Sequence, residues 1–392
     1  MTLWDRLVGQ EDVVATLRRA AADAALGREG EPGPAMTHAW LLTGPPGAGR
    51  STAAQVFAAA LLCEQQGCGQ CETCREVMSD THADVSRFST PGTQIRREQV
   101  EELLALAARL PSFGRYRVMI VEDADRLNDT SGNMLLKSIE EPTAHTVWVL
   151  CSPSPVDVLP TILSRCRVAA LRTPPWRDVA RMLEAQEGVD PAMAAFAARV
   201  SQGHIGRARA LATDEAARLR RQEVLRLPLS LHDLPACFAA AADIVAAATD
   251  DATAWTGPLD AAEVEEVLAM YGDGATGKGM TSKRAERQAS AQLKELELAQ
   301  KRRRTRAVRD GLDRAMIDLM SFYRDVLVLQ LGVDTELVNE ELRPALGQVA
   351  AAGTPESTRS RLEAITRTRT SFESNAAPQL LIEALTVELA RP

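Results

Sequence analysis

The stretch GPPGAGRS at residues 44–51 has the residue types of a phosphate-binding loop. In the pattern G-x-x-x-x-G-K-[ST], glycines let backbone N–H groups converge on phosphate oxygens, and the final hydroxyl ligates Mg²⁺. Arg50 replaces the lysine, and its longer, planar guanidinium cannot simply substitute for an ammonium group. A chance glycine-rich turn is the alternative. The pattern predicts a degenerate site for ATP or ADP, whose loop residues are Gly44, Gly47, Gly49, Arg50, Ser51 and Thr52.

Glu122 and Asp123 form the acidic partner that such a loop requires. They follow the apolar run 117–121, which predicts a buried strand. Hydrolytic sites have Asp then Glu, because the aspartate supports Mg²⁺ and the glutamate polarises the attacking water. The reversed order leaves each carboxylate one methylene from the required length, and a misplacement of about 1 Å can cost ~100-fold in rate. The pair therefore argues against hydrolysis, although an acidic helix cap accounts well for Asp125.

A cluster of cysteines could hold a metal. Cys63, Cys68, Cys71 and Cys74 have the spacing C-x4-C-x2-C-x2-C. Four thiolates this close can converge on one tetrahedral Zn²⁺, which soft sulfur ligands select over magnesium or calcium. An iron–sulfur cluster and unligated thiols are the alternatives. Because four protein ligands leave no open coordination position, we predict a structural zinc.

Length and composition limit the kind of protein. At roughly 150 residues per domain, a chain of 392 residues should form two or three domains. The 45% hydrophobic and 25% charged content is that of a soluble globular protein, and the 4% aromatic content favours helices. A net charge of −8 is not that of an autonomous DNA-binding domain. Clustered cysteines, with no signal-peptide pattern and no long apolar window, predict a cytoplasmic protein without membrane contact.

Hydrophobic periodicity predicts two kinds of region. Residues 1–175 alternate short strands with helices, which predicts a parallel sheet covered on both faces. From about Pro174 the pattern becomes helical, with a compact unit at 176–213. We expect strands at 37–42, 117–121 and 146–151, helices at 9–25, 51–62 and 98–110, and loops at 249–258 and near 271–283.

Further motifs connect these features to one family. The chain contains LPTILSRC at 159–166, LVGQ at 7–10 and NMLLKSIEEP at 133–142, besides the cysteines that follow the phosphate-loop helix. It resembles the bacterial replicative clamp loader, the AAA+ pentamer that places the sliding clamp on primed DNA. The resemblance rests on specific motifs over about 1–213. It implies a P-loop AAA+ core at 1–175 with a zinc module at 63–74, a small helical lid at 176–213 and an all-helical collar at 214–392.

Two kinds of subunit in this family carry such a core. The tau/gamma subunits hydrolyse ATP, whereas the delta-prime subunit often has a degraded loop and keeps the Ser-Arg-Cys triplet. By resemblance Arg165, flanked by Ser164 and Cys166, acts in trans as an arginine finger on a neighbour's ATP. A solvated surface arginine is the alternative. The implied partners are tau/gamma and delta subunits, with the sliding clamp and primer–template DNA reached through the complex.

Three departures favour the delta-prime kind. Arg50 replaces the lysine, Glu122-Asp123 reverses the acids, and Gly206 falls where the family's ATP-sensing arginine would lie. Arg207 is adjacent, but one helical step of about 100° turns it elsewhere. The resemblance thus implies a scaffold and arginine-finger donor that is not itself an effective ATPase. An active tau/gamma-like ATPase is the main alternative, and a P-loop protein outside replication is the weaker one.

Two C-terminal stretches resemble functional motifs, but we interpret both as ordinary structural segments. The segment GDGATGKG at 272–279 repeats part of the phosphate-loop pattern, but it follows a helical pattern and lacks the hydroxyl, so we expect a mobile loop. The basic run KRRRTR at 301–306 is interpreted as a solvated helix face, with a DNA-backbone contact as the alternative. Dense apolar spacing at 316–331 predicts a buried helix.

Overall fold

The computed structural model describes residues 2–26, 33–90, 94–143, 145–271, 282–372 and 376–391. The chain forms two compact units, Met1–Asp214 and Glu215–Pro392. Each has its own hydrophobic core. The expected division of residues 1–213 into a core and a lid stays a prediction. The loop expected near 271–283 and the second glycine-rich motif fall almost entirely on residues 272–281, outside the described residues.

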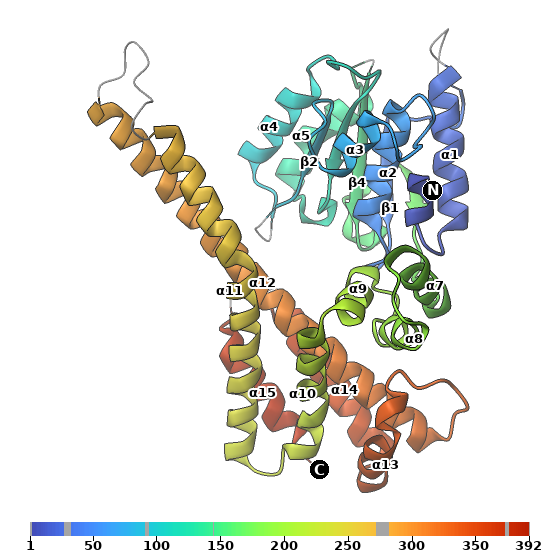
Figure 1. Cartoon of the computed structure of the whole chain (residues 1–392), viewed down its shortest axis with the longest axis vertical. Helices are drawn as coiled ribbons and strands as arrows, with labels where there is room; N and C mark the ends of the chain where they lie inside the picture. Colours follow the sequence, from blue (N-terminus) through green and yellow to red (C-terminus); the bar gives the residue numbers. More distant parts are fainter. Residues whose placement is uncertain are drawn as a thin grey trace. The chain divides into compact units, whose positions relative to one another are not determined.

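A five-stranded parallel sheet forms the centre of the first unit (Figure 1). The three central strands, which are the three predicted from apolar runs, consist entirely of buried residues. The two edge strands escape the sequence prediction because they are short and mix polar with apolar residues. The predicted α/β core is therefore confirmed. The order is β2-β3-β4-β1-β5, with β1 (Ala39–Thr43), β2 (Val85–Phe88), β3 (Arg117–Val121), β4 (Thr146–Ser152) and β5 (Arg167–Ala170).

Helices cover both faces of this sheet, as the alternating pattern predicts (Figure 1). Trp40 of β1 packs in one core and Trp148 of β4 in the other, because neighbouring strand residues point to opposite faces. Trp40 stacks edge-on against Phe57 at a ring separation of 5.1 Å. The helices are α1 (Glu11–Leu26), α2 (Arg50–Leu62) and α3 (Glu72–Met78) on the Trp40 side, and α4 (Arg97–Ala107), α5 (Asp129–Glu140) and α6 (Pro160–Leu163) on the Trp148 side.

Three short helices complete the first unit, as expected for residues 176–213. They are α7 (Trp176–Glu187), α8 (Pro191–Val200) and α9 (Ile205–Thr213). The LVGQ motif holds the segment that leads from the sheet to these helices. The Gln10 side chain donates to the carbonyl of Arg172 at 2.7 Å and accepts from its N–H at 3.0 Å, so the exit of the sheet is held by two hydrogen bonds.

Within its described residues, the second unit is helical in all its regular elements. The predicted helix 316–331 is confirmed, and its Met316, Phe322 and Val326 are fully buried. Along the described residues, none of the helices combines the length and apolar character needed to span a bilayer. The helices are α10 (Glu215–Ser230), α11 (Leu234–Tyr271), α12 (Ser282–Leu331), α13 (Arg343–Ala352), α14 (Pro355–Ser371) and α15 (Pro378–Leu389).

The loop predicted at 249–258 is wrong, because helix α11 continues through it. Ala252 and Thr256 are buried, and packing along α12 outweighs the local cost of Pro258, which removes one backbone donor. Asp260 pairs with Arg303 at 3.2 Å and with Arg304 at 3.3 Å. Part of the basic run therefore pairs with α11, and the DNA contact weighed for that run stays untested.

Candidate functional site

The glycine-rich loop joins β1 to α2 as the sequence predicts. Gly49 precedes α2 at φ 93°, in the left-handed region that favours glycine, and its carbonyl accepts from the N–H of Ala53 at 2.8 Å. Gly47, at φ 82°, is approached so closely by His204 that a Cβ atom would lie 2.2 Å from the imidazole ring. His204 caps α9, and the next residue, Ile205, donates its N–H to the Gly47 carbonyl at 3.3 Å. Helix α9 is thus fastened to the phosphate loop.

Ser51 and Glu122, predicted separately, meet in the structure. The Ser51 hydroxyl donates to Oε2 of Glu122 at 2.5 Å. The other carboxylate oxygen, Oε1, accepts from Nε of Arg87 at 2.8 Å. Arg87 extends from β2, and its Nη1 also reaches Asp80 at 2.8 Å. Both oxygens of Glu122 are therefore already hydrogen-bonded, one of them to a positively charged side chain.

Asp123 lies close to Glu122 in sequence but has different partners. Its Oδ2 accepts from the N–H of Thr90 at 3.3 Å, and its Oδ1 lies 3.8 Å from Nε of Arg126. Burial raises the pKa of the nearby Asp125 carboxyl above its usual range, and the charge of Asp123 adds to the effect. The structure therefore joins Glu122, and not Asp123, to the Ser51 hydroxyl.

Arg50 lies in the first turn of α2, next to Ser51 and the half-buried Thr52. Its Nη1 atom is buried and has no hydrogen-bond partner among the described residues. A buried guanidinium nitrogen without a partner is costly unless an anion completes it. The loop therefore fits a phosphate group. The Ser51–Glu122–Arg87 chain does not fit Mg²⁺, because a guanidinium already neutralises the carboxylate.

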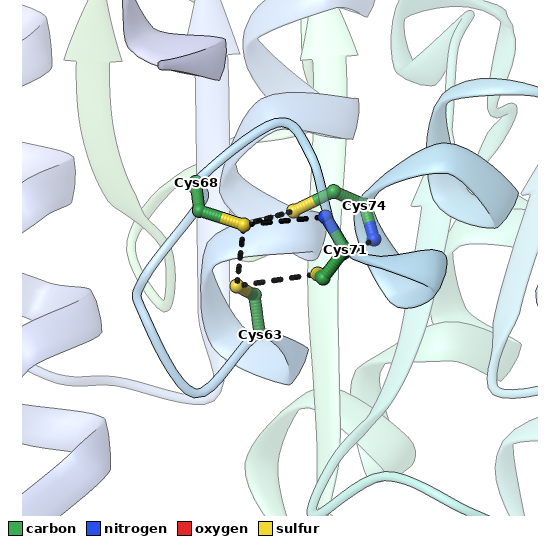
Figure 2. Close-up of side chains that lie close together, drawn as sticks. All are labelled: Cys63, Cys68, Cys71 and Cys74. Carbon is green, nitrogen blue, oxygen red and sulfur yellow. Dashed lines mark hydrogen bonds between the residues drawn. The ribbon is translucent and has the colours of Figure 1, made fainter. Parts of the chain in front are cut away.

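The four predicted metal ligands converge (Figure 2). Cys63 Sγ lies 3.7 Å from that of Cys68 and 3.6 Å from that of Cys71, and the sulfurs of Cys68 and Cys74 are 4.0 Å apart. A tetrahedral site with Zn–S bonds of about 2.3 Å requires sulfurs about 3.8 Å apart. All four sulfurs lie within 4.8 Å of one another, so the donor set fits one zinc ion.

Local backbone geometry brings these thiols together. Cys63 directly follows α2, and Cys71 caps α3, where its sulfur accepts from the N–H of Cys74 at 3.4 Å. The N–H groups of Gln70 and Cys71 donate to Cys68 Sγ and lower the pKa of that thiol to about 6. Burial raises the pKa of Cys71 and of Cys74. A buried thiolate cluster needs a cation to offset its charge, and zinc would supply it.

Arg165 lies just after α6, on the exterior of the first unit, with 38% of its side chain exposed. Glu140, Thr161 and Ser164 contact its guanidinium, and none of these residues belongs to the phosphate loop. Burial raises the pKa of the neighbouring Cys166 thiol to about 12, which makes this cysteine a packing residue rather than a nucleophile.

Several side chains that contact the predicted site residues escape the sequence analysis. Among them are Arg87 beside Glu122, His204 beside Gly47, and Glu140 beside Arg165. Each comes from an element far along the chain from the residue it contacts, so no local spacing reveals the pairing. The NMLLKSIEEP motif at 133–142 marks Glu140 as part of a matching stretch, but it does not indicate what that residue touches.

The region that contains these candidate site residues also matches a known protein family. The family model described as DNA polymerase III, delta subunit, matches residues 32–175, which contain the phosphate loop, the cysteines and Arg165. Relatives of two kinds also match part of the chain. This part of the chain is therefore similar to clamp-loader subunits. The delta-prime subunit of Pseudomonas aeruginosa DNA polymerase III is 38% identical over 135 residues, which cover 33% of this chain and 41% of that protein.

Tau-type relatives match more of the chain at lower identity. The tau subunit of Salmonella typhimurium is 31% identical over 182 residues, or 45% of this chain and 27% of that protein. The gamma/tau subunit of Mycobacterium tuberculosis is 34% identical over 192 residues, which cover 47% of this chain and 31% of that protein. The chain therefore spans less than half the length of these relatives. A solved gamma subunit-related protein from Thermotoga maritima aligns over 96% of this chain and 99% of its own, at 14% identity and a TM-score of 0.41.

Proposed function

We propose that this chain is a clamp-loader protein, the delta-prime subunit of bacterial DNA polymerase III. It acts in the cytoplasm as a scaffold and as the donor of an arginine finger, and it is not itself an effective ATPase. Its partners are the tau/gamma and delta subunits, and through them the sliding clamp and primer–template DNA. The observation that carries the proposal is the Arg87–Glu122–Ser51 chain, in which a side-chain cation lies beside the carboxylate expected to support Mg²⁺.

The state of this site supports a subunit that does not hydrolyse ATP. A hydrolytic P-loop needs the Ser51 oxygen and an acidic residue to serve the metal. Here Glu122 is hydrogen-bonded to both Ser51 and Arg87, and the second acid, Asp123, contacts Thr90 and Arg126 instead. The loop retains the buried Nη1 of Arg50, which has no hydrogen-bond partner among the described residues, so a bound phosphate group remains compatible with it.

The position of Arg165 supports its role in trans. An arginine finger must reach the phosphates of another chain, so it has to be exposed and attached to a rigid element. Arg165 is exposed, and Ile162 of the preceding helix α6 is fully buried in the core. Ser164 supplies a hydroxyl that contacts the guanidinium, and Cys166 anchors the other flank by its burial.

The cluster of four cysteines serves this function as a structural zinc module. It rigidifies the end of α2 and contacts the N-terminal segment. The Trp4 indole N–H donates to the carbonyl of Gln66 at 2.9 Å, and the backbone N–H of Leu3 donates to the carbonyl of Gly67 at 3.0 Å. The module therefore fixes the start of the chain against the helix that follows the phosphate loop.

An active tau/gamma-like ATPase is the second candidate, because tau-type relatives match a larger share of the chain. The two candidates predict opposite results for the isolated zinc-loaded chain. We expect no ATP turnover above background from it alone. Reconstituted with tau/gamma and delta subunits of the same organism, it should support DNA-stimulated ATPase activity. Saturable ATP hydrolysis by the isolated chain would contradict the delta-prime assignment.

The arginine-finger role has its own test in the reconstituted complex. Arg165→Ala should leave assembly intact and lower ATPase activity by roughly 10³-fold at each site it serves, the usual effect of removing such a finger. Arg97→Ala is a matched control, because Arg97 is an exposed arginine of the same unit that pairs with Glu101 at 2.9 Å. Normal ATPase activity in the Arg165→Ala complex would exclude the finger role.

A further inference from the structure

The guanidinium of Arg165 is held in one orientation by its own subunit. Oε1 of Glu140 lies 2.5 Å from both Nε and Nη2, and Nη1 donates to the Thr161 carbonyl at 2.8 Å and to the Ser164 hydroxyl at 3.1 Å. A guanidinium has five N–H donors in a rigid plane. These contacts engage four of them and fix both the direction and the plane of the group, leaving one donor on Nη2.

The fold brings Glu140 to this position. Glu140 is the last residue of α5, and α6 packs closely against that helix. Gly132 of α5 permits the approach, because a Cβ atom there would lie 2.2 Å from Leu159. The carboxyl end of a helix also carries a partial negative charge that favours a cation. The α5 terminus therefore attracts the Arg165 guanidinium through both its backbone and its last side chain.

We propose that Glu140 is the positioning residue of the arginine finger. This inference rests on the proposed action of Arg165 in trans. Glu140 does not touch the neighbour's nucleotide, and it acts by restricting the rotamers of Arg165 so that the remaining donor points outward. Preorganised donors stabilise a transition state because they need no reorientation when charge develops. An unrestrained arginine on the surface would lose this advantage.

The proposal predicts a distinctive kinetic change. The neighbour's own loop binds the ATP ground state, so loss of finger orientation should lower kcat and leave KM for ATP unchanged. We expect Glu140→Ala to lower kcat of the reconstituted complex roughly tenfold, since misorientation of a catalytic group costs rate without removing it. Glu140→Gln keeps an acceptor oxygen at the same reach, so it should stay within about threefold of wild type.

The experiment is a double-mutant cycle in the full reconstituted complex. ATPase kinetics and assembly by gel filtration are measured for Glu140→Ala, Glu140→Gln, Arg165→Ala and the Glu140→Ala/Arg165→Ala pair. Glu140→Ala should cost nothing further once Arg165 is absent. Glu141→Ala is the matched control, because Glu141 is the next residue, is exposed, and has no ion pair among the described residues.

The outcomes distinguish the finger role of Arg165 from the positioning role of Glu140. If Arg165→Ala leaves kcat unchanged, the finger role itself is wrong. If Arg165→Ala lowers kcat but Glu140→Ala does not, the finger role survives and the positioning role is overturned. A Glu140→Ala loss that persists in the Arg165→Ala background, or that appears as weaker assembly or a higher KM, would mean a structural effect and would also overturn the proposal. A rise in kcat would overturn it too, because Glu140 would then restrain the finger.

Discussion

The hydroxyl of Ser51 donates to Oε2 of Glu122 at 2.5 Å, which joins the two sides of the proposed nucleotide site. The hydrogen bond itself is compatible with a metal-binding P-loop, where the same two groups lie close together. What changes the site is Arg87, whose Nε lies 2.8 Å from the other carboxylate oxygen. A cation on a side chain thus takes the place next to Glu122 where a divalent metal would otherwise be attracted.

Removing the charge of Arg87 should restore affinity for a divalent cation. We expect Arg87→Gln to bind Mn²⁺ about tenfold more tightly than wild type in the presence of ADP, because a charge-assisted hydrogen bond contributes about 1.5–3 kcal/mol. Electron paramagnetic resonance of free Mn²⁺ measures the affinity directly.

Two further variants make this prediction specific to the Glu122 carboxylate. Glu122→Gln added to Arg87→Gln should abolish the gain. Arg97→Gln, which removes a charge from the exposed Arg97–Glu101 pair, should leave Mn²⁺ affinity at the wild-type value. Wild-type protein that binds Mn²⁺ as tightly as Arg87→Gln would show that Arg87 does not exclude the metal.

The cysteine cluster should hold one zinc ion per chain, as a closed site with four thiolates requires. Cys74→Ser removes a ligand that is almost completely buried, so we expect loss of zinc and a lower melting temperature. Inductively coupled plasma mass spectrometry measures the metal, and thermal unfolding measures the stability. Cys237→Ser is the control, because Cys237 lies in the other compact unit and should leave the zinc content unchanged.

An equally stable chain purified without metal would contradict the structural role. Iron in place of zinc, with visible absorption, would support the iron–sulfur alternative instead.

The central strands could be predicted because each is a short, continuous apolar run, and burial on both faces leaves no other place for such a run. The edge strand β2 contains Arg87 and Ser86 and lacks this signal. The loop wrongly expected at 249–258 shows that tertiary packing can also override a local sequence signal. Its Gly257 and Pro258 suggest a break locally, whereas buried Ala252 and Thr256 keep α11 helical against α12.

The cysteine site could be predicted because its ligands are neighbours in sequence, and a few turns of backbone bring them together. The pairs at the other sites depend on the fold. Arg87 and Glu122 meet because β2 and β3 are adjacent strands, and Arg165 meets Glu140 because α6 packs on α5. Sequence motifs identified Glu122 and Arg165 as candidate site residues, and only the tertiary arrangement shows which side chain each of them contacts.

Arg221 should be essential for the stability of the second unit. It is buried, and its guanidinium contacts Asp318 at 3.1 Å, Asn339, and Glu341 at 3.4 Å, which ties α10 to α12 and to the loop before α13. Arg221→Ala removes the buried cation that contacts Asp318, so the free energy of unfolding should fall by roughly 3–5 kcal/mol. Urea denaturation of the full chain measures this change.

The exposed ion pair of Arg359 and Glu363 on α14 provides the comparison, since exposed pairs contribute at most about 1 kcal/mol. If Arg221→Ala costs no more than Arg359→Ala, the buried network does not stabilise the unit.

Asp84 should make the stability of the first unit depend on acidic pH. It is fully buried, and burial alone would raise its pKa. The N–H groups of Ser112, Gly114 and Phe113 donate to its carboxylate at 2.5, 2.6 and 2.8 Å and outweigh that effect, so its pKa lies below the usual value. A lowered carboxyl pKa stabilises the fold above the unfolded pKa, and this contribution disappears as the pH falls through the folded pKa.

Wild-type stability should therefore decline below about pH 4, the ordinary pKa of an aspartate. Asp84→Asn should be less stable at pH 7 by roughly 1–3 kcal/mol, because an amide is a weaker acceptor for three N–H groups, and it should lose less on acidification. Urea denaturation of both chains at pH 7 and pH 3 gives the difference, in which acid release of zinc cancels. Asp157→Asn, at an exposed position, should follow wild type at both pH values. Equal acid sensitivity of the Asp84→Asn and wild-type chains would show that Asp84 does not carry this pH dependence.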